Sequence, residues 1–354
     1  ADSEVYYGRG IAHYDLQQYD NALADYNEAL RQNPNYAEAY GNRGNVYQYG
    51  RNEFDTAIAD YTQALSIRES DIDLHNRGNA YQYGKQDYAR ALTDYARAIQ
   101  LDPEDSALRI DYGNVMHAQN DHAGAIAQYN EALRIQPGYA TAIYNRGNSY
   151  STMGELQRAF DDWSEAVRLD PNYADAWGNR ADWYYDRGEY DNAIVDADRA
   201  LAIRVNAADS YTRGLAYQYG RNDLVSAIAD FDRALAIEPN SVEYNNTSCW
   251  ARAMAERELD LARSQCDIAV AGSAEGNYRD SRGMVGLRQG RFQDAWNDYN
   301  AAVQTAPQTP HYLYGRGIAA LRLGRTAEGQ ADLAAAAAIS AGIAETYAGY
   351  GITP

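Results

Sequence analysis

A pattern of about 34 residues repeats along almost the whole chain, and this constrains the fold more than any other feature. A small residue recurs at steps of 33 to 35 residues, at Gly10, Gly44, Gly78, Gly113, Gly147, Ala181, Gly214, Cys249, Gly283 and Gly317. A second small residue follows each of these, at Ala22, Ala57, Ala91, Ala125, Ala159, Ala193, Ala227, Ala262, Ala295 and Gly329. A period of this length is typical of units that must stack on one another to bury their apolar faces.

Within each unit, apolar residues recur at three- and four-residue spacing, as in Ala57, Ile58, Tyr61, Ala64 and Leu65, which predicts amphipathic helices. Glycine inside a helix costs about 1 kcal/mol relative to alanine, so its regular use indicates that two helices approach closely there. Many units close on proline, which ends a helix: Pro34, Pro103, Pro137, Pro171, Pro239 and Pro307.

Spacing, small residues, aromatic residues and closing prolines together resemble the tetratricopeptide repeat family over nearly the whole chain. The resemblance implies an all-α, right-handed superhelical solenoid of ten repeats, each made of two antiparallel helices. The expected repeats span about 3–36, 37–70, 71–105, 106–139, 140–173, 174–206, 207–241, 242–275, 276–309 and 310–341. Residues 342–354 are expected to form a capping helix and tail, because terminal repeats need a cover.

Two kinds of repeat depart from the pattern. Repeats 2, 3 and 7 contain Tyr-Gln-Tyr-Gly, at 47–50, 81–84 and 217–220, followed by one extra residue, which predicts a lengthened turn. Repeat 8 is the most degenerate and resembles a variant found in bacterial tetratricopeptide proteins that carry an export signal.

Arginine and aspartate occur together in the repeats. Eight repeats have an arginine just before the first small residue and an aspartate three residues after the second, and repeats 4 and 8 lack both. This co-occurrence predicts a guanidinium–carboxylate pair between the two helices of a repeat. Binding of an acidic ligand by these arginines is the functional alternative.

The chain has two cysteines. Cys249 occupies a small-residue position, and Cys266 occupies a position that holds an aromatic residue elsewhere. These positions face each other within one repeat, so we expect a structural disulfide and with it an oxidising compartment, periplasmic or secreted. Two buried free thiols and a cytoplasmic location are the alternatives.

Asparagines line the face of the first helices that the family uses for ligands. Each lies near a partner three residues away, so the pairs share a helix face. The predicted partner-binding residues of repeats 2 to 6, which include two tyrosines one turn further on, are Asn42, Asn45, Tyr49, Asn76, Asn79, Tyr83, Asn114, Asn145, Asn148, Asn179 and Asp182. Amides offer both donors and acceptors, which suits the backbone of an extended peptide.

The asparagine pattern is similar to the ladder in the repeats of the O-linked N-acetylglucosamine transferase, which grips peptide backbone. It differs from the carboxylate clamp of heat-shock co-chaperones, because Gly41, His75 and Tyr144 stand where that clamp needs lysine. Some asparagines could instead bridge neighbouring repeats. Tyr49 and Tyr83, with Tyr185 and Tyr219, could edge the same groove or only pack the turns.

Composition limits the partner. With 31 basic and 50 acidic residues the formal charge is −19, which argues against nucleic acid and favours a neutral or basic partner. No apolar run approaches the roughly 20 residues of a spanning helix. The five histidines are scattered, and His117 and His122 are not spaced to share a helix face, so no metal, cofactor or catalytic group is predicted.

The sequence therefore predicts a non-catalytic scaffold that binds an extended peptide or partner protein in a concave groove. A carbohydrate-binding accessory protein of the cell envelope is the alternative, since tyrosine and asparagine suit sugar rings and hydroxyls. A purely structural spacer is a third interpretation.

Overall fold

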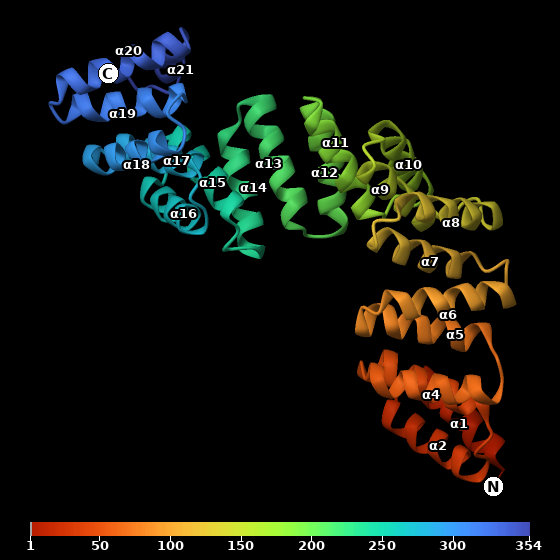
Figure 1. Cartoon of the computed structure of the whole chain (residues 1–354). Helices are drawn as coiled ribbons and strands as arrows, with labels where there is room; N and C mark the ends of the chain where they lie inside the picture. The colour runs from red at the N-terminus through yellow and green to blue at the C-terminus, as the bar shows by residue number, and fades with distance from the viewer. Residues whose placement is uncertain (1) are drawn as a thin grey trace. The chain divides into compact units, whose positions relative to one another are not determined.

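The computed structural model describes residues 2–354, and over this range it is helical without strands. Its contacts divide it into two compact units, Ala1–Pro171 and Asn172–Pro354. In each unit consecutive helices pack as antiparallel pairs, and each pair lies against the next (Figure 1). The prediction of an all-α, repeat-based helical fold is confirmed.

The first unit contains ten α-helices and two short π-helical segments. They are α1 (Ser3–Asp15), α2 (Tyr19–Gln32), α3 (Ala37–Asn45), η1 (Val46–Gly50), α4 (Phe54–Ile67), α5 (Asp71–Asn79), η2 (Ala80–Lys85), α6 (Tyr88–Leu101), α7 (Ser106–Ala118), α8 (His122–Ile135), α9 (Ala140–Thr152) and α10 (Leu156–Leu169).

The second unit continues the pairing and ends on a short helix. Its elements are α11 (Ala174–Asp186), α12 (Tyr190–Ile203), α13 (Ala207–Arg221), α14 (Leu224–Ile237), α15 (Val242–Ala255), α16 (Leu259–Gly272), α17 (Gly276–Arg288), α18 (Phe292–Thr305), α19 (Pro310–Arg322), α20 (Thr326–Ile339) and α21 (Ile343–Gly349). The buried residues Ile343 and Tyr347 place α21 over the core formed by α15 and α17 to α20.

The repeated small residues are explained by an aromatic ring on the partner helix. A Cβ atom built on Gly44 would lie 2.7 Å from the ring of Tyr61, and one on Gly78 would lie 2.5 Å from Tyr95. The second small residue, such as Ala57 or Ala91, is fully buried. In most helix pairs, one aromatic ring therefore packs directly against a glycine of the partner helix.

The Tyr-Gln-Tyr-Gly segments lengthen the first helix as well as the turn. In repeats 2 and 3 the segment forms η1 and η2, so the extra residue is absorbed in a wide, π-helical last turn. The amides of Glu53, Asp87 and Asp223 bond to carbonyls six residues earlier, whereas ordinary turns such as Glu155 to Tyr150 span five. The prediction of a lengthened turn is thus confirmed, and the π-helical geometry of that turn in repeats 2 and 3 was not predicted.

Candidate functional site

The arginines before the small residue are held inside the helix pairs. Arg77 donates from Nε and Nη2 to both carboxylate oxygens of Asp94, at 2.8 and 2.7 Å. The same two-point contact joins Arg9 to Asp25, Arg43 to Asp60, Arg146 to Asp162, Arg180 to Asp196, Arg213 to Asp230, Arg282 to Asp298 and Arg316 to Asp332. The predicted pairing is confirmed, and these guanidinium groups hold the helix pairs together.

Most of these arginines also reach the preceding helix pair, which the sequence analysis missed. Arg43 Nη1 donates to Asn27 Oδ1 at 2.6 Å, and Arg77 Nη1 donates to Thr62 Oγ1 at 3.1 Å. The corresponding acceptors of Arg146, Arg213, Arg282 and Arg316 are Asn130, Asp198, Asp267 and Asn300. Each acceptor lies two residues after the position of the paired aspartate, which is glutamine in repeats 4 and 8, so one arginine ties two successive repeats.

The two repeats without this pair use a displaced arginine. In repeat 8, the buried Arg252 lies one turn after Ser248 and donates to Ser248, Asp232 and Glu258. In repeat 4, Arg109 donates to Gln128 at 3.2 Å. Repeats 4 and 8 therefore also place an arginine between their helices, but this arginine comes from a different position in the first helix.

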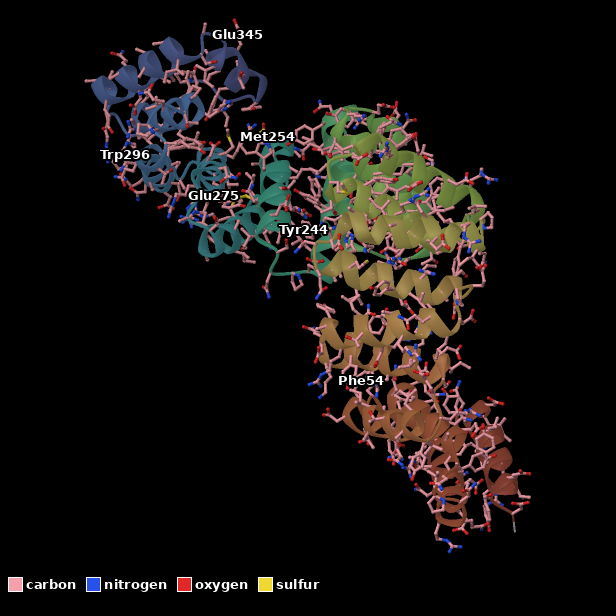
Figure 2. All side chains as sticks on the ribbon, turned by 45° about the vertical axis from the view of Figure 1, so that its right-hand side comes forward. Phe54, Tyr244, Met254, Glu275, Trp296 and Glu345 are labelled. Carbon is pink, nitrogen blue, oxygen red and sulfur yellow. A yellow bond between two sulfur atoms is a disulfide. The ribbon has the colours of Figure 1, made fainter. Side chains whose placement is uncertain are left out.

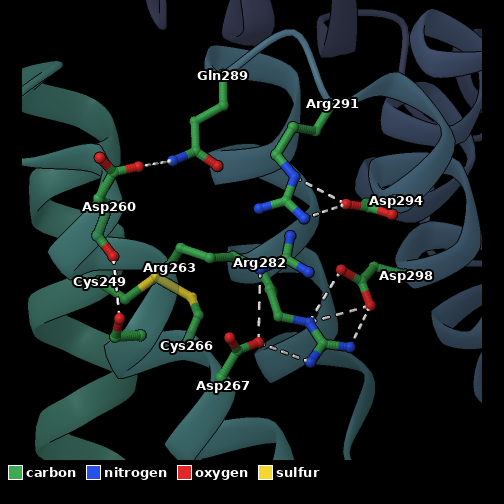
Figure 3. A network of polar contacts seen from close by, with 11 residues as sticks. Cys249, Asp260, Arg263, Cys266, Asp267, Arg282, Gln289, Arg291, Asp294 and Asp298 are labelled. Carbon is green, nitrogen blue, oxygen red and sulfur yellow. Dashed lines mark hydrogen bonds and ion pairs between the residues drawn. A yellow bond between two sulfur atoms is a disulfide. The ribbon is translucent and has the colours of Figure 1, made fainter.

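Cys249 and Cys266 are joined by a disulfide between α15 and α16, with Cα atoms 5.6 Å apart. The bridge occupies the space that a glycine and an aromatic ring fill in other repeats. Figure 3 shows it beside the network in which Arg282 contacts Asp267 and Asp298. The bridge thus lies at the junction with the next helix pair.

The predicted asparagines of the first unit form what we call the amide–tyrosine face. It consists of Asn42, Asn45, Tyr49, Asn76, Asn79, Tyr83, Asn114, Asn145 and Asn148, on α3, η1, α5, η2, α7 and α9. The asparagines are partly exposed. In this face, the second asparagine of each pair points its carbonyl oxygen at the aromatic residue of the partner helix.

These carbonyl contacts fix the direction of the amides. Asn148 Oδ1 accepts a hydrogen bond from Trp163 Nε1 at 3.0 Å, and indole nitrogen can only donate. The same position in the other repeats accepts from a tyrosine hydroxyl, at 2.8 Å between Asn45 and Tyr61, 2.6 Å between Asn79 and Tyr95 and 2.9 Å between Asn114 and Tyr129. The shared geometry indicates one amide orientation throughout.

The first asparagine of a pair bridges to the previous repeat. Asn76 Nδ2 donates to Asn45 Oδ1 at 3.0 Å, and Asn145 Nδ2 donates to Asn114 Oδ1 at 2.8 Å. Asn42 donates in the same way to the Tyr7 hydroxyl. The amides are therefore linked along the face. Within residues 2–354, the Nδ2 groups of Asn45 and Asn114 make no hydrogen bond to a protein acceptor, so both are available to a ligand.

The tyrosines of the face stand out from it. Tyr49 and Tyr83 are 51% and 61% exposed, while their neighbours Gln48 and Gln82 are buried. Tyr49 reaches Asn76 Oδ1 at 3.4 Å. Gly50 and Gly84 let the same segments pack on Tyr19 and Phe54 of the previous repeat. Partial burial and the Asp111 carboxylate raise the pKa of Tyr83, so its hydroxyl stays neutral.

Three histidines near this face make polar contacts. His75 Nε2 lies 2.7 Å from an Asp111 oxygen. His117 and His122 approach each other with their Nδ1 atoms 3.2 Å apart, because His122 begins the partner helix. The prediction considered only spacing along one helix, so it could not show that His117 and His122 meet across the turn between two helices. Among the described residues, no group of three or more His, Cys, Asp or Glu side chains is arranged to hold a metal ion.

The remaining predicted residues belong to the second unit. Asn179 and Asp182 lie on α11, and the exposed Asp182 accepts from Thr212 Oγ1 at 2.6 Å. Tyr185 packs on Tyr190, and Tyr219 is 58% exposed. Asp182 is thus bonded within the second unit.

Family models of tetratricopeptide repeats match several stretches, which together cover more than half of the chain: 3–36, 25–66, 74–105, 113–154, 140–173, 174–208 and 281–343. No curated protein has a significantly similar sequence. No helix among residues 2–354 is long and apolar enough to cross a membrane.

Solved structures show the same fold. PilF of Pseudomonas aeruginosa is 21% identical with a TM-score of 0.54, over 59% of this chain and 94% of PilF. The C-terminal part of a TPR repeat-containing protein from Cytophaga hutchinsonii is 18% identical with a TM-score of 0.53, over 67% of this chain and 97% of that one. YrrB, described as a TPR protein with an unusual peptide-binding site, is 24% identical with a TM-score of 0.44, over 49% and 90%.

Proposed function

Since this chain belongs to the tetratricopeptide repeat family, we propose that it is a non-catalytic scaffold that binds an extended peptide segment of a partner protein on the amide–tyrosine face. The family fold supports a role in protein–protein interaction. We also propose that each helix pair is one repeat, which gives the ten repeats expected from the sequence.

One observation carries the proposal. The carbonyl oxygens of Asn45 and Asn114 are bound by aromatic residues of their own repeats, which leaves their Nδ2 groups as donors on an accessible face. An extended peptide presents backbone carbonyl groups at regular intervals, and such donors match them. The exposed rings of Tyr49 and Tyr83 add surfaces on which peptide side chains can pack.

Charge defines the kind of peptide. The arginines next to the asparagines are already paired, as Arg43 is with Asp60 and Arg146 with Asp162. The chain carries a formal charge of −19, and Asp111 lies within the electrostatic reach of the face. A neutral or basic segment is therefore favoured.

The test uses substitutions that preserve the internal bonds. Asn45→Asp and Asn114→Asp keep an oxygen for the tyrosine hydroxyls and for Asn76 and Asn145, but replace the outward donor by an acceptor. Peptides selected from a displayed library of random 12-residue sequences should bind the double variant at least about tenfold more weakly. Asn297→Asp, on α18, makes the same kind of substitution elsewhere and adds one negative charge, and this variant should bind normally. Undiminished binding to the double variant would contradict the proposal.

The exposed tyrosines favour a second candidate, which is binding of a carbohydrate. Rings that are more than half exposed can stack on sugar rings, and neighbouring amides can bond to hydroxyls. On a glycan array, this alternative requires hits that disappear when Tyr49 and Tyr83 are both replaced by alanine.

The disulfide supports an oxidising compartment, periplasmic or secreted, as the site of action. Intact mass measured without reductant, on protein taken from its native host, should be 2 Da below the reduced mass, because closing one bridge removes two hydrogens. A fully reduced chain would favour the cytoplasm.

A further inference from the structure

A second candidate site lies inside the second unit, where α13 and α15 end beneath the C-terminal helix α21. A cavity of about 510 Å³ is lined there by Gln218, Tyr219, Trp250, Met254, Glu345 and Tyr350, among others. Figure 2 labels two of these residues, Met254 on α15 and Glu345 on α21. None of them belongs to the amide–tyrosine face.

We propose that this cavity receives an arginine side chain of a partner protein. The inference does not rest on the proposed peptide site, since the residues and the unit are different. It rests on the aromatic walls, on a carboxylate without an ion partner and on the arginines that lie over three other tryptophans of this chain.

Three aromatic side chains line the cavity. Trp250 and Tyr350 meet edge to face with ring centroids 5.6 Å apart, and Tyr219 is 58% exposed. The pKa of Tyr350 is raised by burial and then by the neighbouring Asp280 and Tyr219, so its hydroxyl stays neutral. Faces of such rings attract a planar cation and tolerate its apolar stem.

A carboxylate supplies the second part of the site. Glu345, on α21, lies at the edge of the cavity, and within residues 2–354 it forms no ion pair. A guanidinium group provides several N–H donors in one plane, so it can bond to a carboxylate while its face lies on an aromatic ring.

The chain itself shows that arginine packs on its partly buried tryptophans. Arg187 lies 3.7 Å from the Trp183 ring centroid, Arg180 lies 4.6 Å from Trp177, and Arg325 lies 4.6 Å from Trp296. Among the described residues, no arginine of the chain covers Trp250. The ring of Trp250 is therefore available to an arginine of a partner protein, whereas the other three rings are covered by arginines of this chain.

The basic groups nearby are already neutralised. Arg288 donates to the Tyr350 carbonyl oxygen and pairs with Glu256 at 2.6 Å. Arg221 pairs with Asp191 at 2.7 Å. Neither leaves an unbalanced positive charge beside the cavity, and the acidic chain as a whole attracts a cation.

The experiment titrates the full chain with N-acetyl-arginine-N-methylamide and follows the Trp250 indole N–H and the Met254 methyl group by NMR. The matched probes are the citrulline compound, which has the same shape without the charge, and the lysine compound. Arginine should shift both signals, citrulline should not, and lysine should bind about fivefold more weakly, because it lacks the planar fork.

Variants locate the effect. Glu345→Gln, on the surface, should weaken arginine binding about fivefold, while Glu328→Gln, beside Trp296, should leave it unchanged. Circular dichroism should show that both variants keep the fold. Equal binding of citrulline would overturn the cation site, and equal binding of lysine would overturn the assignment to arginine. Unchanged affinity in Glu345→Gln would place binding elsewhere.

Discussion

Asp94 shows how much a single paired residue contributes. Its carboxylate is 5% exposed and accepts two hydrogen bonds from Arg77. Asp94→Asn would leave a half-buried guanidinium without its counter-charge, and we expect a loss of roughly 3 kcal/mol in the free energy of unfolding. Urea denaturation measures this loss. Glu69→Gln breaks the exposed pair with Arg97 and should change the stability little, because solvent screens that pair. Equal losses in the two variants would show that burial is unimportant here.

Asp280 predicts a dependence of stability on pH. Burial raises the pKa of its carboxyl group from 3.8 to about 7, although the Tyr299 hydroxyl opposes the shift. Because the folded chain binds this proton more tightly than the unfolded chain, stability is greatest at low pH and is lost as the pH rises from about 4 through about 7.

We therefore expect Asp280→Asn to raise the melting temperature at pH 8 by several degrees and to change it little at pH 4.5. Differential scanning calorimetry at both pH values tests this. Asp186→Asn, at an exposed position, is the control and should show no such difference. A gain for Asp280→Asn that is the same at both pH values would contradict the assignment.

Sequence reasoning worked best for pairs of residues that are either both present or both absent in a repeat. Arg77 and Asp94 have counterparts in the same eight repeats, so their contact could be predicted without coordinates. The second acceptor of these arginines could not, because Asn27, Thr62 and Asp198 share only the ability to accept a hydrogen bond. The orientation of the Asn148 amide was also hidden, since it depends on a ring from the partner helix.

Among the helical elements, η2 depends on a glycine. A Cβ atom at Gly84 would lie 2.1 Å from Phe54 Cγ, on the helix of the previous repeat. Gly84→Ala should therefore destabilise the chain by about 1–3 kcal/mol, measured by chemical denaturation. Gly8→Ala, in α1, has no neighbour within 4 Å and should stabilise by up to about 1 kcal/mol. Similar losses for both would refute the packing explanation.

Helix pairing was predictable because period and amphipathic spacing both require it, whereas local helix geometry was not. The extra residue after Tyr81-Gln-Tyr-Gly84 indicated an insertion, but a loop and a π-helical turn absorb one residue equally well in sequence. The meeting of His117 and His122 has the same origin, because spacing within one helix says nothing about a contact across the turn.

For the whole molecule, the formal charge of −19 predicts how binding responds to salt. If the peptide partner is basic, long-range attraction speeds its association. Raising NaCl from about 50 mM to about 500 mM should slow association roughly tenfold with a smaller effect on dissociation, as measured by stopped-flow fluorescence. A peptide in which glutamine replaces every basic residue should be nearly insensitive. Equal sensitivity of both peptides would exclude steering by charge.

The repeat architecture could be predicted from the sequence because the same small and apolar residues recur at the same positions in nearly every repeat. It could not predict the cavity at Trp250, whose walls come from α13, α15 and α21. Tyr219 and Tyr350 are 131 residues apart, and no periodic signal connects a capping helix to a repeat so far before it.

The disulfide between α15 and α16 has a mechanical consequence. A chain of stacked hairpins pulled from its ends can unravel one hairpin after another, because each is held mainly by its neighbours. The bridge closes a segment of 17 residues, so roughly 55–60 Å of chain cannot be drawn out while it is intact. Unfolding under tension would therefore stop at this hairpin as long as the disulfide is intact. Reduction of the disulfide would allow the 17-residue segment to extend.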